Sequence, residues 1–155
     1  MSRVQLALNV SDLDSAIDFY TKLFKTPPAK IKPGYANFAV EEPPLKLVLI
    51  EGHGQPGSLN HIGVEVFSTD EVVATQERLT GAGLSCTAEN GACCYAVQDK
   101  VWVDGPDQLP WEIYTVLADA DTPNGEFAEV DTAGATAEAD NLCCGSVPES
   151  AARCC

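Results

Sequence analysis

An internal repeat is the feature that most limits how this chain can fold. Residues 3–10, RVQLALNV, match residues 59–66, LNHIGVEV, at an offset of 56, and the same offset carries into the segments that follow. Each copy begins with the alternation of apolar and polar residues that is typical of a half-buried strand. A helical pattern and three short strand patterns come next in both copies. The repeat therefore predicts an α+β fold of two βαβββ modules, over residues 1–55 and 56–118.

Local signals place the elements within each module. Ser11 with Asp14, and Ser68 with Glu71, have the spacing of a capping box, so each pair predicts the start of a helix. The second helix should end at Gly81, because glycine favours the backbone conformation that closes a helix. The remaining strands are expected at residues 29–32, 35–40, 45–50, 85–89, 95–104 and 111–117.

The offset grows toward the end of the repeat. Lys46 in LKLVLIE aligns best with Glu112 in WEIYTVL, which is an offset of 66, so the second module is expected to have gained ten residues. Most of the gain lies before Lys100, in the stretch that holds Cys93 and Cys94. An insertion into one copy of a repeat is usually a surface loop, and such loops often carry function. We therefore expect the two cysteines in a loop.

Strand alternation also predicts a polar site. Gln5 lies on the polar face of the first strand, and His61 is its repeat mate on the matching strand. The apolar faces should pack against the helices, so the polar faces should line a concave surface on which Gln5 and His61 approach each other. Glu112 begins the final strand. A lone histidine at a strand start more often serves as a hydrogen-bonding surface residue, and His53, in a glycine-rich loop, is interpreted as solvated.

Composition excludes several classes of function. The chain has 155 residues and a net charge of −14, and so acidic a surface repels nucleic acid and anionic membranes. No apolar run approaches the roughly 20 residues of a membrane span, and the N-terminus lacks the apolar core of a signal peptide. We therefore expect a cytoplasmic protein with no nucleic-acid or membrane partner. Residues 119–155 are rich in Ala, Asp, Glu, Gly and Thr and are expected to form a flexible, disordered acidic tail.

Six of the seven cysteines form three adjacent pairs. A cytosolic protein keeps its cysteines reduced, and adjacent cysteines bridge each other poorly. Reduced thiols bind soft cations such as cadmium, and trivalent arsenic. The alternative for the first pair is that one cysteine is a small buried hydrophobic residue and the other is incidental. The pairs are Cys93-Cys94, Cys143-Cys144 and Cys154-Cys155.

Two βαβββ modules with polar strand faces resemble the vicinal oxygen chelate superfamily of glyoxalases, bleomycin resistance proteins and extradiol dioxygenases. The resemblance implies a U-shaped mixed sheet around a metal cleft, with metal ligands on the first and last strand of each module. It implies Gln5, His61 and Glu112 as the ligands. It puts Lys46 in the fourth position, where a charged lysine cannot ligate. Three nitrogen or oxygen ligands with open positions suit a metal that binds O₂ and substrate.

Longer runs resemble a narrower group, the ArsI-type carbon–arsenic lyases and the cadmium-induced protein CadI. The resemblance implies that Gln5, His61 and Glu112 hold Fe(II). It implies that Cys93 and Cys94 hold a trivalent organoarsenical, and that O₂ is used to break its carbon–arsenic bond. The products would be arsenite and an oxidised carbon fragment, which is formaldehyde when the organic group is methyl. The matching runs are SRVQLALNV, KPGYANFAV, PPLKLVLIE, LNHIGVEV, CCYAVQDKVWV and PWEIYTVLAD.

Other residues receive less definite roles. Tyr95 and Lys100 adjoin the first thiol pair and are candidates for substrate contacts, although Lys100 also fits a plain surface lysine. No catalytic residue is identifiable beyond the metal ligands. The tail pairs lie outside the matching runs and either scavenge trivalent arsenicals for the core site or have no catalytic role. These tail residues are Cys143, Cys144, Cys154 and Cys155.

Two other functions stay open. Three thiol pairs on an acidic chain fit a detoxification protein that sequesters cadmium or arsenite without catalysis. Another activity of the superfamily, such as an extradiol dioxygenase or a thiol transferase for antibiotics, fits the predicted fold. Neither of these enzymes needs the Cys93-Cys94 pair.

Overall fold

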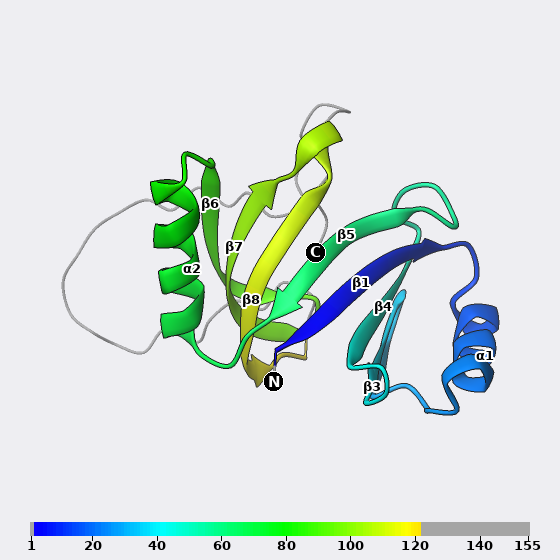
Figure 1. Cartoon of the computed structure of the whole chain (residues 1–155). Coiled ribbons are helices and arrows are strands. Elements are labelled where there is room, and N and C mark those ends of the chain that lie inside the picture. Colours follow the sequence, from blue (N-terminus) through cyan, green and yellow to red (C-terminus); the bar gives the residue numbers. More distant parts are fainter. Residues whose placement is uncertain (1, 122–155) are drawn as a thin grey trace.

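The computed structural model describes residues 2–121 of the chain. They form one eight-stranded mixed sheet, in the order β2-β3-β4-β1-β5-β8-β7-β6, with two α-helices (Figure 1). The predicted pair of βαβββ modules is confirmed. The first module consists of β1 (Arg3–Val10), α1 (Leu13–Phe24), β2 (Lys30–Lys32), β3 (Tyr35–Val40) and β4 (Leu45–Glu51). The second consists of β5 (Leu59–Glu65), α2 (Thr69–Gly81), β6 (Cys86–Cys93), β7 (Ala96–Asp104), a short 3₁₀ helix (Pro106–Gln108) and β8 (Pro110–Asp119).

The two modules join at the centre of the sheet, where β1 and β5 pair antiparallel. Leu6 pairs with Ile62, its own repeat mate, so an approximate twofold axis passes through this pair. In Figure 1, β1 and β5 cross the middle of the molecule, and α1 and α2 lie at opposite ends. The sequence repeat is therefore also the symmetry of the fold.

The helix starts agree with the sequence signals in one module and differ by one residue in the other. Ser68 caps α2, and its hydroxyl accepts a hydrogen bond from the Glu71 backbone N–H at 3.3 Å. The residue that caps α1 is Asp12 and not Ser11, because the Asp12 carboxylate accepts from the Ser15 backbone N–H at 2.7 Å. Neither helix of residues 2–121 is long and apolar enough to cross a bilayer.

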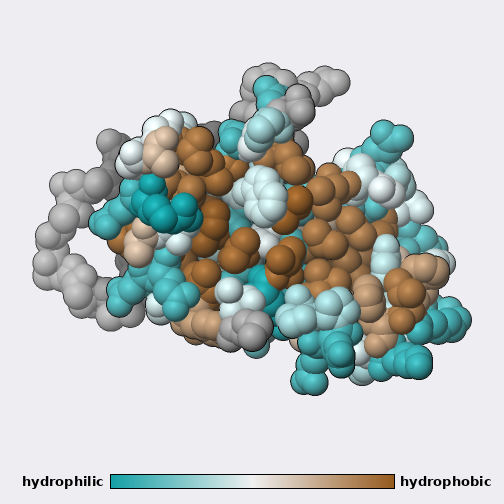
Figure 2. Space-filling model, viewed as in Figure 1, coloured by the Kyte–Doolittle hydropathy of each residue, from teal (hydrophilic) through white to brown (hydrophobic). Residues whose placement is uncertain are grey.

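The apolar strand faces pack beneath the helices, as predicted. One hydrophobic cluster lies under α1 and another under α2, and Cys86, the unpaired seventh cysteine, belongs to the second cluster. Between the helices this outer face stays partly uncovered: Figure 2 shows apolar side chains gathered there. The buried members of the first cluster are Leu13, Ala36, Phe38, Val40, Leu47 and Leu49.

The residues gained by the second module form a long hairpin and not the predicted surface loop. β6 begins at Cys86, 56 residues after the start of β2 at Lys30, and β7 ends at Asp104, 64 residues after the end of β3 at Val40. The difference is eight residues, all within this hairpin, so the predicted gain of ten is wrong. A hairpin absorbs added residues into its hydrogen-bonded ladder, whereas a loop would leave their backbone groups unpaired.

The hairpin tip reaches the first module and closes the U of the sheet. Tyr95, at the tip, packs against Tyr35, Val48 and Ile50 of the first module, with 5.8 Å between the two tyrosine ring centroids. Lys30 Nζ on β2 donates to the Tyr95 carbonyl at 3.0 Å. The two ends of the sheet therefore meet around an enclosed concave face.

Candidate metal and thiol site

Gln5, His61 and Glu112 come together on the concave face, as predicted. Each is at most 5% exposed. Gln5 Nε2 lies 3.0 Å from His61 Nε2 and 3.1 Å from Glu112 Oε2, and the latter two atoms are 3.5 Å apart. β5 lies between β1 and β8, and its Gly63 is in register with both Gln5 and Glu112. Since glycine has no side chain, nothing separates the two outer residues.

These spacings fit one divalent metal. Ligand atoms about 2.1 Å from a metal lie about 3.0 Å apart at a right angle and about 3.4 Å apart at the tetrahedral angle. The 3.5 Å between His61 Nε2 and Glu112 Oε2 is close to this range, and the Gln5 amide group lies within 3.1 Å of both atoms. Within residues 2–121 no three His, Cys, Asp or Glu side chains gather at a metal position, so a third protein ligand has to come from the Gln5 amide oxygen. One imidazole, one carboxylate and one amide leave open positions on a metal such as iron.

Hydrogen bonds behind His61 set its tautomer. Its Nδ1 lies 2.7 Å from the Asn60 side-chain oxygen, and the Asn60 side-chain nitrogen donates to Asn9 at 3.0 Å. The Asn60 oxygen is thus the acceptor, and His61 Nδ1 carries the proton. Nε2, which faces Gln5 and Glu112, then keeps its lone pair for a metal. Metal-binding histidines are commonly held by such a second hydrogen bond.

Glu112 is shared between the candidate metal position and Lys100. Lys100 Nζ lies 3.0 Å from Oε1, whereas Oε2 faces Gln5 and His61. Burial raises the pKa of Glu112, but the charge of the neighbouring Lys100 lowers it, and the net result is a pKa of about 2. Burial lowers the pKa of Lys100, yet its attraction to Glu112 produces a net increase. Lys100 is therefore a buried partner of Glu112, and the alternative of a plain surface lysine is wrong.

Tyr114 completes the cluster, and the sequence did not single it out as a site residue. Its hydroxyl donates to Gln5 Oε1 at 2.6 Å. Burial, followed by the carboxylates of Glu65 and Glu112, raises the pKa of Tyr114, so the hydroxyl stays protonated. Alternation puts Tyr114 on the same strand face as Glu112. That signal was weak, because a tyrosine in a strand usually belongs to the hydrophobic core.

Lys46 lines the site but is not the structural counterpart of Glu112. In the first module Ala7 pairs with Val48, and in the second Gly63, the repeat mate of Ala7, pairs with Glu112. The counterpart of Glu112 is therefore Val48, 64 residues earlier, in agreement with the eight-residue hairpin insertion. The expected place of Lys46 in the fourth ligand position is wrong by two residues. Val48 has no ligating atom, so the first module still supplies no fourth ligand.

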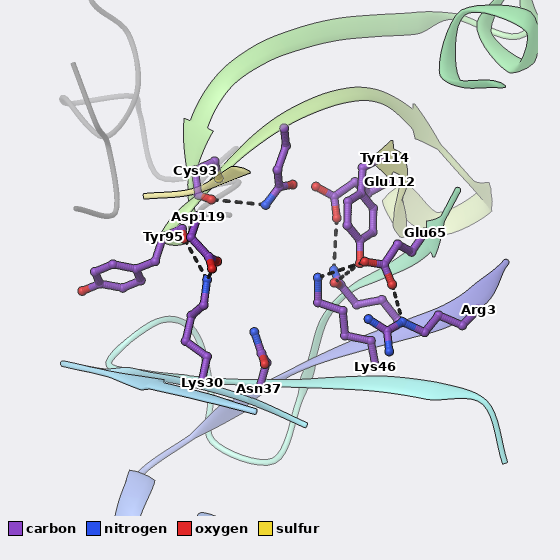
Figure 3. A network of polar contacts seen from close by, with 12 residues as sticks. Arg3, Lys30, Asn37, Lys46, Glu65, Cys93, Tyr95, Glu112, Tyr114 and Asp119 are labelled. Carbon is purple, nitrogen blue, oxygen red and sulfur yellow. Dashed lines mark hydrogen bonds and ion pairs between the residues drawn. The ribbon is translucent and has the colours of Figure 1, made fainter. Parts of the chain in front are cut away.

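A charged network surrounds Lys46 on the side away from the thiols (Figure 3). Lys46 Nζ is 3.7 Å from Glu65 Oε1 and lies over the Tyr114 ring, 4.8 Å from its centroid, and Arg3 forms an ion pair with the same Glu65. Burial lowers the pKa of Lys46, partly offset by the attraction of Glu65. The network fixes Lys46 beside Tyr114 and not at the metal position.

The thiol pair lies at the tip of the hairpin. Cys93 is the last residue of β6, and Cys94 and Tyr95 form a two-residue turn with φ values of 52° and 61°. Positive φ at both positions is required by the type I′ turn, which usually contains Asn-Gly, so side chains as large as these strain the backbone. The two Sγ atoms are 3.7 Å apart, too far for a disulfide with each other. Cys93 is nevertheless disulfide-bonded in this structure, so the pair of thiols expected from the sequence requires reduction.

One narrow cavity connects the thiol side to the metal side. Cys94 lines it together with all three candidate ligands. A wider hollow, lined also by Lys30 and Asp119, shares part of this lining. Gln98, which the sequence did not single out, belongs to both, and its Nε2 donates to the Cys93 carbonyl at 3.2 Å. The other residues that line the narrow cavity are Tyr35, Lys46, Val48 and Lys100.

The remaining residues predicted from the sequence lie elsewhere. The Tyr95 side chain packs into the first module, and its hydroxyl lies 3.4 Å from the Pro33 carbonyl. His53 is exposed, as predicted. The tail pairs and the expected disordered segment fall outside the described residues, apart from residues 119–121, of which Asp119 is the last residue of β8. The tail cysteines are Cys143, Cys144, Cys154 and Cys155.

Comparison with known proteins identifies the family. Residues 3–113 match the family model described as the Glyoxalase/Bleomycin resistance protein/Dioxygenase superfamily. The chain belongs to this superfamily. Among solved structures, the fold is similar to an extradiol ring-cleaving dioxygenase from B. fuscum, with a TM-score of 0.59 and 17% identity over 77% of this chain and 34% of that chain. It is also similar to methylmalonyl-CoA epimerase from Mycobacterium tuberculosis, with a TM-score of 0.55 and 18% identity over 72% of this chain and 85% of that one.

Relatives with higher identity carry two kinds of name. The cadmium-induced protein CadI of Mycobacterium tuberculosis is 57% identical over 93% of each chain. A trivalent organoarsenical cleaving enzyme of Thermomonospora curvata is 61% identical over 79% of this chain and 82% of its own. Another trivalent organoarsenical cleaving enzyme, from a Bacillus species, is 36% identical over 92% of this chain and 99% of its own. The resemblance to the lyase and cadmium-induced group is thereby confirmed.

Proposed function

We propose that this protein is an Fe(II)- and O₂-dependent lyase that breaks the carbon–arsenic bond of trivalent organoarsenicals. The observation that carries the proposal is the cavity lined by both Cys94 and the three candidate metal ligands. A thiol beside a metal position is what such a reaction requires, because the substrate binds through arsenic and reacts at the adjacent bond. The two relatives named as trivalent organoarsenical cleaving enzymes support the same substrate class.

Cys93 and Cys94, once reduced, hold the arsenic. A trivalent arsenical with two hydroxyl groups exchanges them for the two cysteine sulfurs, the two thiol protons leave with the hydroxyl groups as two water molecules, and the carbon–arsenic bond is kept. The 3.7 Å between the Sγ atoms lets one arsenic atom bind both sulfurs after small side-chain adjustments. Binding there holds the carbon–arsenic bond against the cavity that the metal ligands line, so the contribution of the thiols is positional.

Gln5, His61 and Glu112 would hold Fe(II), which when bound supplies the activation of O₂. Lys100 occupies one oxygen of Glu112, so the carboxylate offers a single oxygen and coordination positions remain open. The ammonium group of Lys100 also attracts a Cys94 thiolate and favours anionic groups in the cavity. For a methyl substrate the reaction balances without another reductant: methylarsonous acid and O₂ give arsenous acid and formaldehyde.

The test uses the full chain, reduced under nitrogen with a phosphine, loaded with Fe(II) and mixed with methylarsenite before air is admitted. Arsenite should be released only when both iron and O₂ are present. Glu112→Ala should abolish release while arsenical binding to the thiols persists, and Cys94→Ser should lose both release and the binding at the Cys93-Cys94 pair. Release without O₂, or no release from any methyl or aromatic arsenical, would refute the lyase.

A binding protein without turnover is the second candidate, supported by the relatives that are named cadmium-induced. It shares the thiols but has no use for the metal ligands. Release of arsenite from methylarsenite separates the two functions, because thiol binding of Cd(II) and arsenite survives Glu112→Ala in either case. A pure binder retains full affinity for both ions in Glu112→Ala and releases no arsenite from methylarsenite in any variant.

A further inference from the structure

The Gln5 side-chain amide directs its nitrogen, and not its oxygen, toward the candidate metal position. Its nitrogen, Nε2, lies 3.0 Å from His61 Nε2 and 3.1 Å from Glu112 Oε2, and its oxygen, Oε1, accepts the Tyr114 hydroxyl hydrogen at 2.6 Å. Metals bind an amide through oxygen. In this orientation the amide hydrogens occupy the lone pairs of His61 and Glu112 that would otherwise face a metal.

The chemistry of the neighbours fixes this orientation in the metal-free site. Were the amide turned over, its oxygen would face the lone pair of His61 and the ionised carboxylate of Glu112, three acceptors without a hydrogen between them. The NH₂ group instead satisfies both neighbours with its two hydrogens. Because an unpaired buried polar atom is costly, the amide remains in this orientation until a cation replaces it.

We propose that the Gln5 amide turns over when metal binds, and that Tyr114 is the positioning residue that keeps a hydrogen bond to it in both orientations. The inference rests on the metal site of the proposed function. A neutral tyrosine hydroxyl is both donor and acceptor. It donates to Oε1 in the metal-free state, and it accepts from Nε2–H after the oxygen has turned toward the metal.

The packing around Gln5 leaves room for rotation of its terminal amide but not for a larger movement of the side chain. A Cβ on Gly63 would lie 3.1 Å from Gln5 Cβ, 3.2 Å from Gln5 Nε2 and 3.2 Å from Tyr114 Cε1, so glycine leaves just enough room for the present side chains. A half-turn of the terminal amide exchanges two atoms of similar size and moves nothing else. The cluster therefore changes its donor pattern without repacking.

The experiment follows the Gln5 side chain by NMR in the full-length, ¹⁵N-labelled, reduced chain. Zn(II) serves as the diamagnetic probe, and Gln5→Leu identifies the resonance of the Gln5 NH₂ group. Reading the titration at that resonance excludes zinc bound to thiols elsewhere. Tyr114→Phe removes the hydroxyl, and Tyr20→Phe is the matched control, because Tyr20 packs in the cluster under α1, away from the site.

Zn(II) should shift the Gln5 NH₂ resonances in the wild-type chain. Tyr114→Phe should raise the unfolding equilibrium constant about tenfold, for both the metal-free and the zinc-loaded chain, relative to Tyr20→Phe. Since the bond is lost from both states, the Zn(II) dissociation constant should stay within about threefold of wild type or increase.

Three results would overturn the inference while leaving the metal site intact. They are Gln5 resonances that zinc binding at His61 does not move, a Tyr114→Phe chain as stable as Tyr20→Phe, and a Zn(II) affinity that rises about tenfold in Tyr114→Phe. The last would mean that the hydrogen bond exists only without metal. Absence of zinc binding at His61 and Glu112 would refute both the inference and the proposed function. Zinc results as expected, with no lyase activity, would refute the function alone.

Discussion

Removing the charge of Lys100 should strongly destabilise the metal-free protein. Lys100 Nζ and Glu112 Oε1 are 3.0 Å apart, and the two side chains are 1% and 4% exposed. At an effective dielectric constant of about 20, that separation corresponds to a gross attraction of about 5.5 kcal/mol. The lowered pKa of Glu112, in spite of its burial, has the sign expected of this attraction. Breaking a buried pair typically costs about 3–5 kcal/mol, because the remaining charge is uncompensated. We therefore expect Lys100→Met to lower the free energy of unfolding by about 3–5 kcal/mol.

Urea unfolding in EDTA, followed by circular dichroism, measures this loss. Lys22→Met is the matched control, since it removes an ion pair with Asp18 whose side chains are 72% and 67% exposed, and exposed helix pairs contribute about 0.3–0.5 kcal/mol. A saturating divalent metal should restore more stability to Lys100→Met than it adds to wild type, because the metal takes over as the countercharge of Glu112. A loss below about 1 kcal/mol, or no larger than that of Lys22→Met, would refute the argument that this pair is buried and coupled.

Three further outcomes follow from the same cluster. The lowered pKa of Glu112 stabilises the metal-free fold fully above about pH 4.5 and progressively less as the pH falls toward 2; unfolding curves across this window should show a steeper loss in wild type than in Lys100→Met. Gly63→Ala should cost about 1–3 kcal/mol by crowding two buried side chains and should weaken Zn(II) binding, whereas Gly81→Ala, with nothing within 4 Å, should do neither. Asn60→Ala frees Nδ1 of His61, the candidate ligand, and should weaken Zn(II) binding about 10–100-fold by competition titration; unchanged affinity would contradict the assigned tautomer.

Much of this fold could be predicted from the sequence, because the strand patterns are local and occur in both copies of the repeat. Alternation in residues 3–10 and 59–66 sorted Gln5 and His61 onto one strand face, and the repeat made them partners across a symmetry axis. Period-2 patterns depend only on which side of a strand meets the core, so they survive without any knowledge of neighbouring strands. The approach of the Gln5 and His61 side chains to each other could therefore be predicted from the sequence alone.

Register between distant strands is a different kind of information. Lys46 and Glu112 look equivalent because both stand second or third in an apolar strand. In the sheet, however, Ala7 pairs with Val48, and Gly63, the repeat mate of Ala7, pairs with Glu112. The residue equivalent to Glu112 is therefore Val48. A shift of two residues keeps every side chain on its original face, so hydrophobic patterning cannot detect it. Only the hydrogen-bonded partner strands determine the alignment, and no local pattern encodes them.

The hairpin was not predicted, because no local pattern in the sequence marks its turn. Cys94-Tyr95 has none of the usual residues of a type I′ turn, so the sequence gives no turn signal there and the inserted stretch resembles a loop. The positive φ values persist because the surroundings over-determine them: β6 and β7 pair up to the tip, and Tyr95 is anchored in the first module. Glycine at Tyr95 would relieve the strain but lose the anchor, and asparagine at Cys94 would relieve it but lose the thiol. The strained turn is thus the arrangement that puts a thiol on the cavity wall while the next residue fixes the tip across the cleft.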